Sequence, residues 1–88
     1  MASSFNTNQV TVQSSAATLI VAENFGRKAV LVTNLGTTAV YIGPNSNVSA
    51  SNGQLLPGVV GASISIPQTG PVWGIAASST EAVSFMDI

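Results

Sequence analysis

Short segments in which apolar and polar residues alternate recur along most of this 88-residue chain. Residues 9–13 (Gln-Val-Thr-Val-Gln) and 63–66 (Ser-Ile-Ser-Ile) alternate cleanly, which is the pattern of a β-strand with one buried face. Five further segments are of similar length and rich in β-branched side chains, as strands usually are. They cover residues 18–22, 29–33, 38–42, 72–77 and 82–87. The sequence therefore predicts about seven short strands.

Turn-forming residues separate these segments. Gly, Asn and Pro gather at residues 24–26, 34–37, 43–45 and 69–71, where a chain can reverse direction. Gly74 is different, because it lies inside an expected strand and indicates a bulge or a close approach of two backbones. No segment has a useful length of helical periodicity. We predict an all-β fold, a small single-domain antiparallel β-sandwich of jelly-roll or immunoglobulin-like type, since periodicity does not encode strand order.

The chain divides into an N-terminal arm and one domain. Residues 1–8 are polar and irregular apart from Phe5, and we interpret them as the arm. Residues 9–88 form the β-sandwich domain, and within it residues 44–61 form a long loop rich in Asn, Ser and Gly. Loops of this length in a compact domain often have a function.

Charged residues are scarce. Only 6% of the residues are charged, against about 25% in ordinary soluble domains, and the formal net charge is −1. Two adjacent basic residues cannot neutralise a row of phosphates, so we expect no nucleic-acid partner. The chain has no Cys and no His, which removes disulfides, thiol nucleophiles, zinc sites of the Cys/His type and histidine acid–base pairs. With no signal sequence and no long apolar run, we expect a soluble protein made in a cytoplasm, without a membrane partner.

The few charged residues make a poor active site. Glu23, Glu81 and Asp87 stand at expected turns or at the terminus, where we predict solvated carboxylates rather than a catalytic pair. A serine nucleophile would need Lys28 as its base, and we interpret Arg27 and Lys28 as solvated loop charges. We therefore expect no enzyme activity and no cofactor.

Side-chain oxygens for calcium are present but weakly suited to it. Asn45, Asn47, Asn52 and Asp87 could supply them, yet a tight site normally needs several carboxylates. We expect these asparagines to form turns and predict no metal site.

Two of the expected strands are apolar on both faces. Alternation places Val30, Val32, Val40 and Ile42 on one face, while Leu31 and Tyr41 point the other way. Only one face can meet the core of so small a sandwich, so the other should meet a partner, the arm or the long loop. Trp73 and Tyr41 could instead stack on sugar rings, although strand aromatics more often belong to a core or an interface. Our candidate interface residues are Phe5, Asn8, Leu31, Tyr41, Leu55, Leu56 and Trp73.

Several segments together resemble small β-sandwich domains of virion proteins from tailed bacteriophages. The resemblance covers about residues 10–88 and rests on hairpin, strand-end and turn patterns that such domains share. In this chain they are Asn34-Leu35-Gly36, Val40-Tyr41-Ile42-Gly43, Asn52-Gly53, Leu56-Pro57-Gly58 and the apolar strand Val72-Trp73-Gly74-Ile75-Ala76. Trp73 departs from the family, in which a smaller aromatic is usual.

The resemblance implies a structural role in a virus particle. Free-standing proteins of this size in such phages are typically capsid decoration (cement) proteins, displayed as oligomers on the head. It thus implies binding to the major capsid protein and to further copies of the chain, with a trimer favoured and the capsid surface as the location. Similar domains also occur in tail, fibre and baseplate proteins, so a module that binds host-surface glycans remains the alternative.

Overall fold

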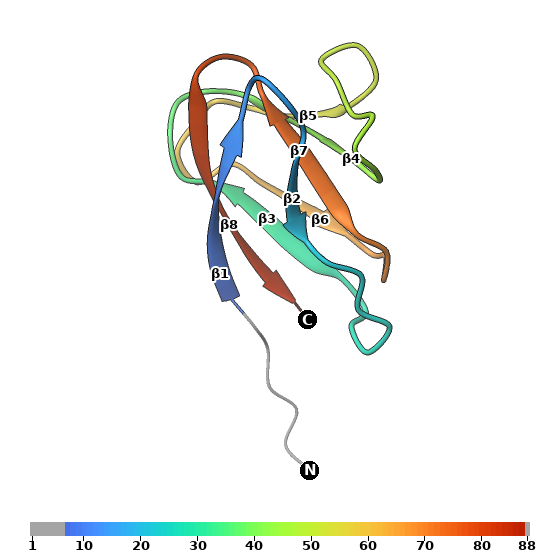
Figure 1. Cartoon of the computed structure of the whole chain (residues 1–88). Helices are drawn as coiled ribbons and strands as arrows, with labels where there is room; N and C mark the ends of the chain where they lie inside the picture. Colours follow the sequence, from blue (N-terminus) through green and yellow to red (C-terminus); the bar gives the residue numbers. More distant parts are fainter. Residues whose placement is uncertain (1–6, 88) are drawn as a thin grey trace.

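The computed structural model describes residues 7–87, which form eight β-strands and no helix, so none of these residues belongs to a membrane-spanning helix. The strands are joined by turns and loops (Figure 1). Their bounds are β1 Thr7–Gln13, β2 Thr18–Val21, β3 Val30–Asn34, β4 Val40–Gly43, β5 Gln54–Leu56, β6 Ser63–Ile66, β7 Val72–Ala76 and β8 Thr80–Asp87.

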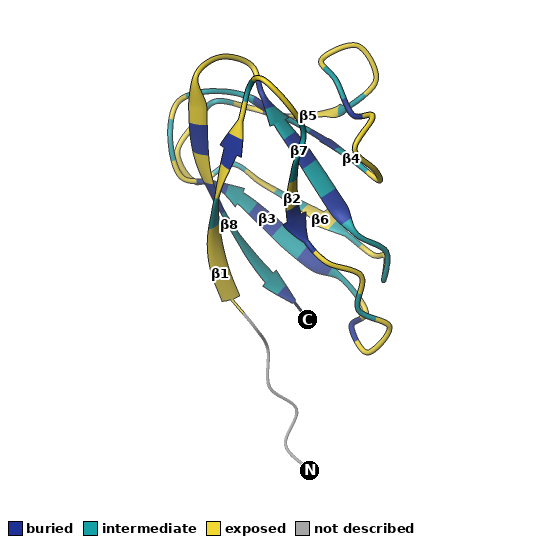
Figure 2. Cartoon of the chain, in the orientation of Figure 1, coloured by how far each residue is buried: buried dark blue, intermediate teal, exposed yellow. Residues whose placement is uncertain are grey.

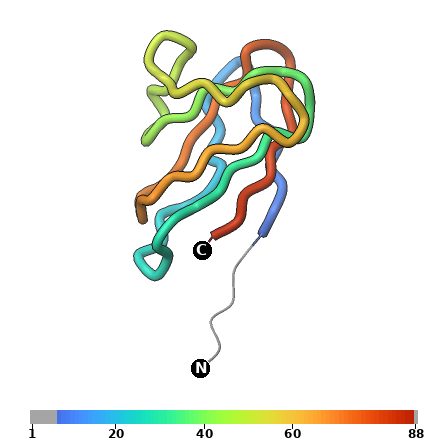
Figure 3. Tube along the Cα trace, turned by 180° about the vertical axis from the view of Figure 1, so that it is seen from behind, coloured from blue at the N-terminus to red at the C-terminus, as the bar shows by residue number. Residues whose placement is uncertain are grey.

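The strands form two antiparallel sheets of four. Sheet A has the order β1-β8-β3-β6, which Figure 3 shows side by side, and sheet B has the order β2-β7-β4-β5. The order follows one rule, because β1 pairs with β8, β2 with β7, β3 with β6 and β4 with β5. An antiparallel ribbon of paired strands that is rolled into two sheets gives this order, and the result is the eight-stranded jelly roll. An immunoglobulin-like order, with consecutive strands A and B in one sheet, is thereby excluded.

The core lies between the two sheets and consists largely of valine. Buried residues alternate with more exposed ones along most strands (Figure 2). The largest buried apolar side chains without solvent exposure are Val12, Val30, Val32, Val40, Leu56 and Val83. Compact β-branched side chains suit the narrow space between two pleated sheets. Alternation along the sequence is thus the direct cause of the layered fold.

All seven predicted strands are present, within about two residues of their predicted ends. The structure adds β5, which lies inside the segment predicted as a loop at 44–61. It also moves the boundary of the arm, because Thr7 and Asn8 belong to β1, where they pair with Met86 and Phe85 of β8. Phe5 and the rest of the predicted arm lie outside the described residues.

Gly74 lies near a bulge of the neighbouring strand, and the atoms close to it belong to side chains, so the expected close approach of two backbones is not found there. The register of β2 against β7 shifts between Leu19 and Val21, so the bulge is at Ile20, opposite Trp73 and Val72, while Gly74 itself pairs with Thr18. A Cβ atom on Gly74 would lie 2.7 Å from the Cδ1 atom of Ile20. The missing side chain of Gly74 therefore makes room for the isoleucine that the bulge turns into the core.

Arg27 is buried, so the prediction of a solvated loop charge is wrong for this residue. Its side chain is 1% exposed and donates hydrogen bonds to the carbonyl oxygens of Ala22, Gln68 and Gly70. The guanidinium also lies 3.4 Å from a carboxylate oxygen of Asp87, which is buried as well. Five donors in a planar fork allow one arginine to join three chain segments. Arg27 thus closes the end of the sandwich where β8 finishes.

Asn34 and Glu81 close the opposite end. The Asn34 amide donates to the carbonyl oxygens of Thr38 and Pro57, at 2.8 and 2.9 Å. The Glu81 carboxylate accepts the backbone N–H groups of Thr38 and Ala82, so this carboxylate is also buried rather than solvated as predicted. Within residues 7–87, every buried side-chain nitrogen and oxygen has a hydrogen-bond partner. Satisfied polar groups of this kind can be buried without a large cost.

Replacing the buried arginine should strongly destabilise the fold. We expect Arg27→Ala to lower the free energy of unfolding by about 3 kcal/mol or more, because it leaves the Asp87 carboxylate buried without its partner. Lys28→Ala is the matched control, since Lys28 is exposed and its removal should cost less than about 0.5 kcal/mol. Urea unfolding measures both, and equal losses would contradict the clamping role of Arg27.

The hairpin between β7 and β8 holds a strained residue. Ser79 has a φ of 55°, the left-handed region that glycine adopts at little cost. Ser79→Gly should raise the free energy of unfolding by about 0.5 kcal/mol, since relief of strain exceeds the entropy that glycine adds to the unfolded chain. Ser78→Gly lacks this relief and should lower it. Thermal unfolding of both variants tests this, and a loss of stability in Ser79→Gly would refute the assignment.

Candidate functional site

Apolar side chains gather on the outer face of sheet B. Trp73 and Ile75 of β7 point away from the core, because they alternate with the buried residues Val72, Gly74 and Ala76. By the same alternation, Tyr41 of β4 points outward between Val40 and Ile42. Leu19 of β2 and Leu55 of β5 extend the set to both edges of the sheet. We name this set, Leu19, Tyr41, Leu55, Trp73 and Ile75, the outer apolar face.

The register makes the outer apolar face continuous. Leu19 lies opposite Trp73, Ile75 lies opposite Tyr41, and Tyr41 lies opposite Leu55. Directly opposed side chains on antiparallel strands have their Cβ atoms about 4.5–5.5 Å apart, within contact distance. The face therefore crosses all four strands of the sheet. Its two edge residues, Leu19 and Leu55, are 40% and 46% exposed, and the other three are half-buried.

One loop borders the outer apolar face. Residues 44–53 follow β4 and fold back, so that the buried side chain of Val48 lies where a Cβ atom on Gly43 would be. A Cβ atom on Gly53 would meet both Val48 and Tyr41. The loop therefore packs against the β4 part of this face, beside Tyr41, while Leu19 and Leu55 remain exposed at its two edges.

The asparagines of this loop form turns, as predicted. The Asn45 side-chain oxygen accepts the N–H group of Asn47, and the Asn52 oxygen accepts that of Ser49, at 2.9 and 2.8 Å. Asp87, the fourth oxygen donor considered for calcium, is bonded to Arg27 instead. The side-chain oxygens of Asn45, Asn52 and Asp87 thus accept hydrogen bonds within the protein.

Five of the seven candidate interface residues lie in three places on the surface. Tyr41, Leu55 and Trp73 lie together on the outer apolar face. Leu31 lies on the outer face of sheet A beside Met86, so Leu31 and Tyr41 are on opposite sides of the sandwich because β3 and β4 belong to different sheets. Asn8 is exposed on the edge strand β1.

Leu56 has to be removed from the candidate surface. It has no solvent exposure and packs in the core, because β5 turns it inward while its neighbour Leu55 points outward. Leu19 and Ile75 were missed. A signal for Ile75 was available, since it stands two residues from Trp73 and therefore on the same face of the strand.

Two of the three carboxylates considered for catalysis lie far apart. Glu81 and Asp87 stand at the two ends of β8, six residues or about 20 Å apart, so they cannot flank one scissile bond. Both are buried in hydrogen bonds at the ends of the sandwich. Only Glu23 and Lys28, among the five charged residues, are exposed. The accessible surface of 4947 Å² is thus almost free of charged side chains.

Comparison with protein-family models, with curated proteins and with solved structures found no match to this chain.

The two adjacent leucines of β5 give a direct test of the assigned faces. Leu56→Ala should lower the free energy of unfolding by about 2–5 kcal/mol, because it opens a cavity in the core. Leu55→Ala should change it by less than about 0.5 kcal/mol, since its side chain faces solvent in the isolated protein. Urea unfolding distinguishes the two, and a reversed order would show that β5 has the opposite register.

Proposed function

We propose that this protein is a structural protein of a bacteriophage particle, a capsid decoration (cement) protein that binds the head surface as an oligomer and stabilises it. The outer apolar face carries this proposal, because it is a continuous apolar stripe with exposed edges and without a charged member. Exposed apolar patches of this kind usually mark an interaction site. The resemblance of residues 10–88 to virion β-sandwich domains suggests the particle as its setting.

The distribution of charge supports a surface that becomes covered. Burying an ion in an interface costs several kcal/mol unless it is well paired. Three of the five charged residues are already paired or bonded inside the fold, so a neighbouring subunit that covers the remaining surface meets few ions. Glu23 and Lys28 are exceptions, and both lie close to the turn before β3. The proposed partners are the major capsid protein and further copies of the chain, with a trimer favoured.

The fold agrees with this proposal without deciding it. Jelly rolls occur in viral capsid proteins and also in lectins, so the architecture alone does not separate a structural role from a carbohydrate-binding one. The evidence for the particle is the family resemblance together with the uncharged, partly exposed face.

A charge placed on the outer apolar face should block attachment. We expect Leu55→Glu to weaken binding to purified heads at least tenfold, because a carboxylate would lose its hydration in the interface. Thr11→Glu is the matched control, since Thr11 is exposed on the outer face of sheet A. Co-sedimentation with heads measures occupancy, and circular dichroism verifies the fold. Undiminished attachment of Leu55→Glu, or equal loss in both variants, would refute the proposed contact.

A tail, fibre or baseplate module that binds host-surface glycans is the second candidate. Trp73 pairs with Gly43, two residues from Tyr41, so the two aromatics are diagonal neighbours on one exposed face. Aromatic rings in such an arrangement can stack on sugars. This function predicts a glycan-array signal that Trp73→Ala or Tyr41→Ala abolishes in a folded protein. If the protein is a capsid decoration protein, we expect no such glycan-array signal.

A further inference from the structure

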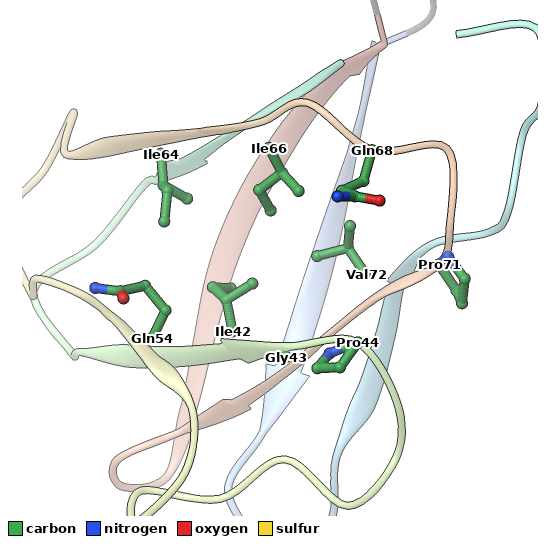
Figure 4. A pocket seen from close by; sticks show the side chains of 9 residues that line it. All are labelled: Ile42, Gly43, Pro44, Gln54, Ile64, Ile66, Gln68, Pro71 and Val72. Carbon is green, nitrogen blue, oxygen red and sulfur yellow. The ribbon is translucent and has the colours of Figure 1, made fainter. Parts of the chain in front are cut away.

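A groove opens between the two sheets along β6, the edge strand of sheet A. It has a volume of about 470 Å³ and is lined by Ile64 and Ile66 on one side and by Ile42 and Val72 on the other. Figure 4 shows these four side chains pointing toward one another, with Gln54 and Gln68 at the sides. None of the residues lining the groove is charged. The groove exists because β5, only three residues long, pairs with β4 no further than Ile42.

The edge beside the groove lacks the usual protection. Proteins commonly protect an edge strand with a charge, a proline or a covering segment, because its unpaired backbone groups can bind another strand. β6 reads Ser-Ile-Ser-Ile, and its two isoleucines remain half-buried at the rim of the core. An extended, uncharged segment with an apolar side chain fits such an edge, since backbone hydrogen bonds and alternate side chains can be matched together.

The N-terminal segment of the chain has these properties. Residues 1–6, Met-Ala-Ser-Ser-Phe-Asn, precede β1 and contain neither a charged side chain nor proline. Phe5 is their only aromatic residue.

The Cα atom of Phe5 cannot reach the β6 edge of its own copy. Thr7, Met86, Leu31 and Ser65 form one row across sheet A, from the β1 edge to the β6 edge. Three steps between strands at about 4.8 Å put Ser65 about 14 Å from Thr7. Phe5 is two residues before Thr7, so its Cα atom can lie at most about 7 Å from that of Thr7. A Phe5 seated between Ile66 and Val72 is therefore supplied more directly by another copy.

We infer that the groove along β6 receives the N-terminal segment of a second copy of this chain, with Phe5 between Ile66 and Val72. This inference rests on the self-association in the proposed function. The segment starts at the β1 edge of sheet A and the groove lies at the β6 edge. A contact between two different surfaces joins copies head to tail, and such contacts close into a ring when the rotation allows. A trimer satisfies this arrangement.

Measuring the self-association of the full chain tests whether Phe5 of a second copy fills the groove. The wild-type protein should have a solution mass of two or more chains of 8.9 kDa each. Phe5→Ala should raise the dissociation constant of this self-association at least tenfold, because the apolar anchor is lost. Phe25→Ala is the matched control. Phe25 is 80% exposed on a turn in which the N–H of Gly26 bonds to the Asn24 side chain. It is thus an exposed phenylalanine that competes with Phe5 as the occupant of the groove. Light scattering that finds a monomeric wild type, or association lost in Phe25→Ala and kept in Phe5→Ala, would overturn the inference.

Disulfide trapping tests the location. The chain has no cysteine, so two singly substituted proteins can be mixed and oxidised without competing thiols. Ser4→Cys, which leaves the Phe5 anchor in place, should form a mixed dimer with Gln68→Cys, at the rim of the groove, at least tenfold faster than with Ser51→Cys, which is exposed on the loop after β4. Equal rates would refute the groove as the receptor. Because the assay needs no phage head, its result is independent of whether the protein attaches to one.

Discussion

The buried guanidinium of Arg27 joins three segments that strand pairing alone does not hold together. It binds carbonyl groups after β2 and between β6 and β7, and it meets Asp87 at the end of β8. Asn34 and Glu81 do the same work at the opposite end of β3 and β8. Both ends of the sandwich are therefore fastened by polar groups inside the protein. A small valine core gains two fixed ends in a chain that has no disulfide to supply them.

The surface follows from the same arrangement. A chain with so few charged residues uses three of them internally, so its exterior depends on Ser, Thr, Asn and Gln for contact with water. Sheet A presents mainly such residues on its outer face, whereas sheet B presents the outer apolar face. The sandwich therefore has two unlike sides. An interaction with other subunits through sheet B explains this asymmetry more simply than packing within the chain does.

The alternation of apolar and polar residues predicted seven strands, because each of them buries one face and that face is marked in the sequence by apolar residues at every second position. β5 escaped notice because Gln54, Leu55 and Leu56 are too few to show a period. The jelly-roll order could not be predicted, since it depends on which strands pair and not on any one strand. The buried charges were missed because residues beside turns are usually solvated. A signal for three of these residues did exist in the alternation. Glu81 and Asp87 lie on the same face of β8 as the buried Val83, and Asn34 lies on the same face of β3 as the buried Val30 and Val32.

The candidate site was predicted in part. Tyr41, Leu55 and Trp73 were named, but only the pairing of β4 with β5 and β7 brings them together, and the assignment of β3 to the other sheet separates them from Leu31. The central claim is that sheet B is covered by neighbours in an assembled particle. A three-dimensional image of the intact phage, at a resolution that places this chain, tests it most directly. We predict that the chain lies on the head with Leu19, Trp73 and Leu55 in contact with other subunits. A chain on the tail, or one on the head with this face open to solvent, would contradict the account.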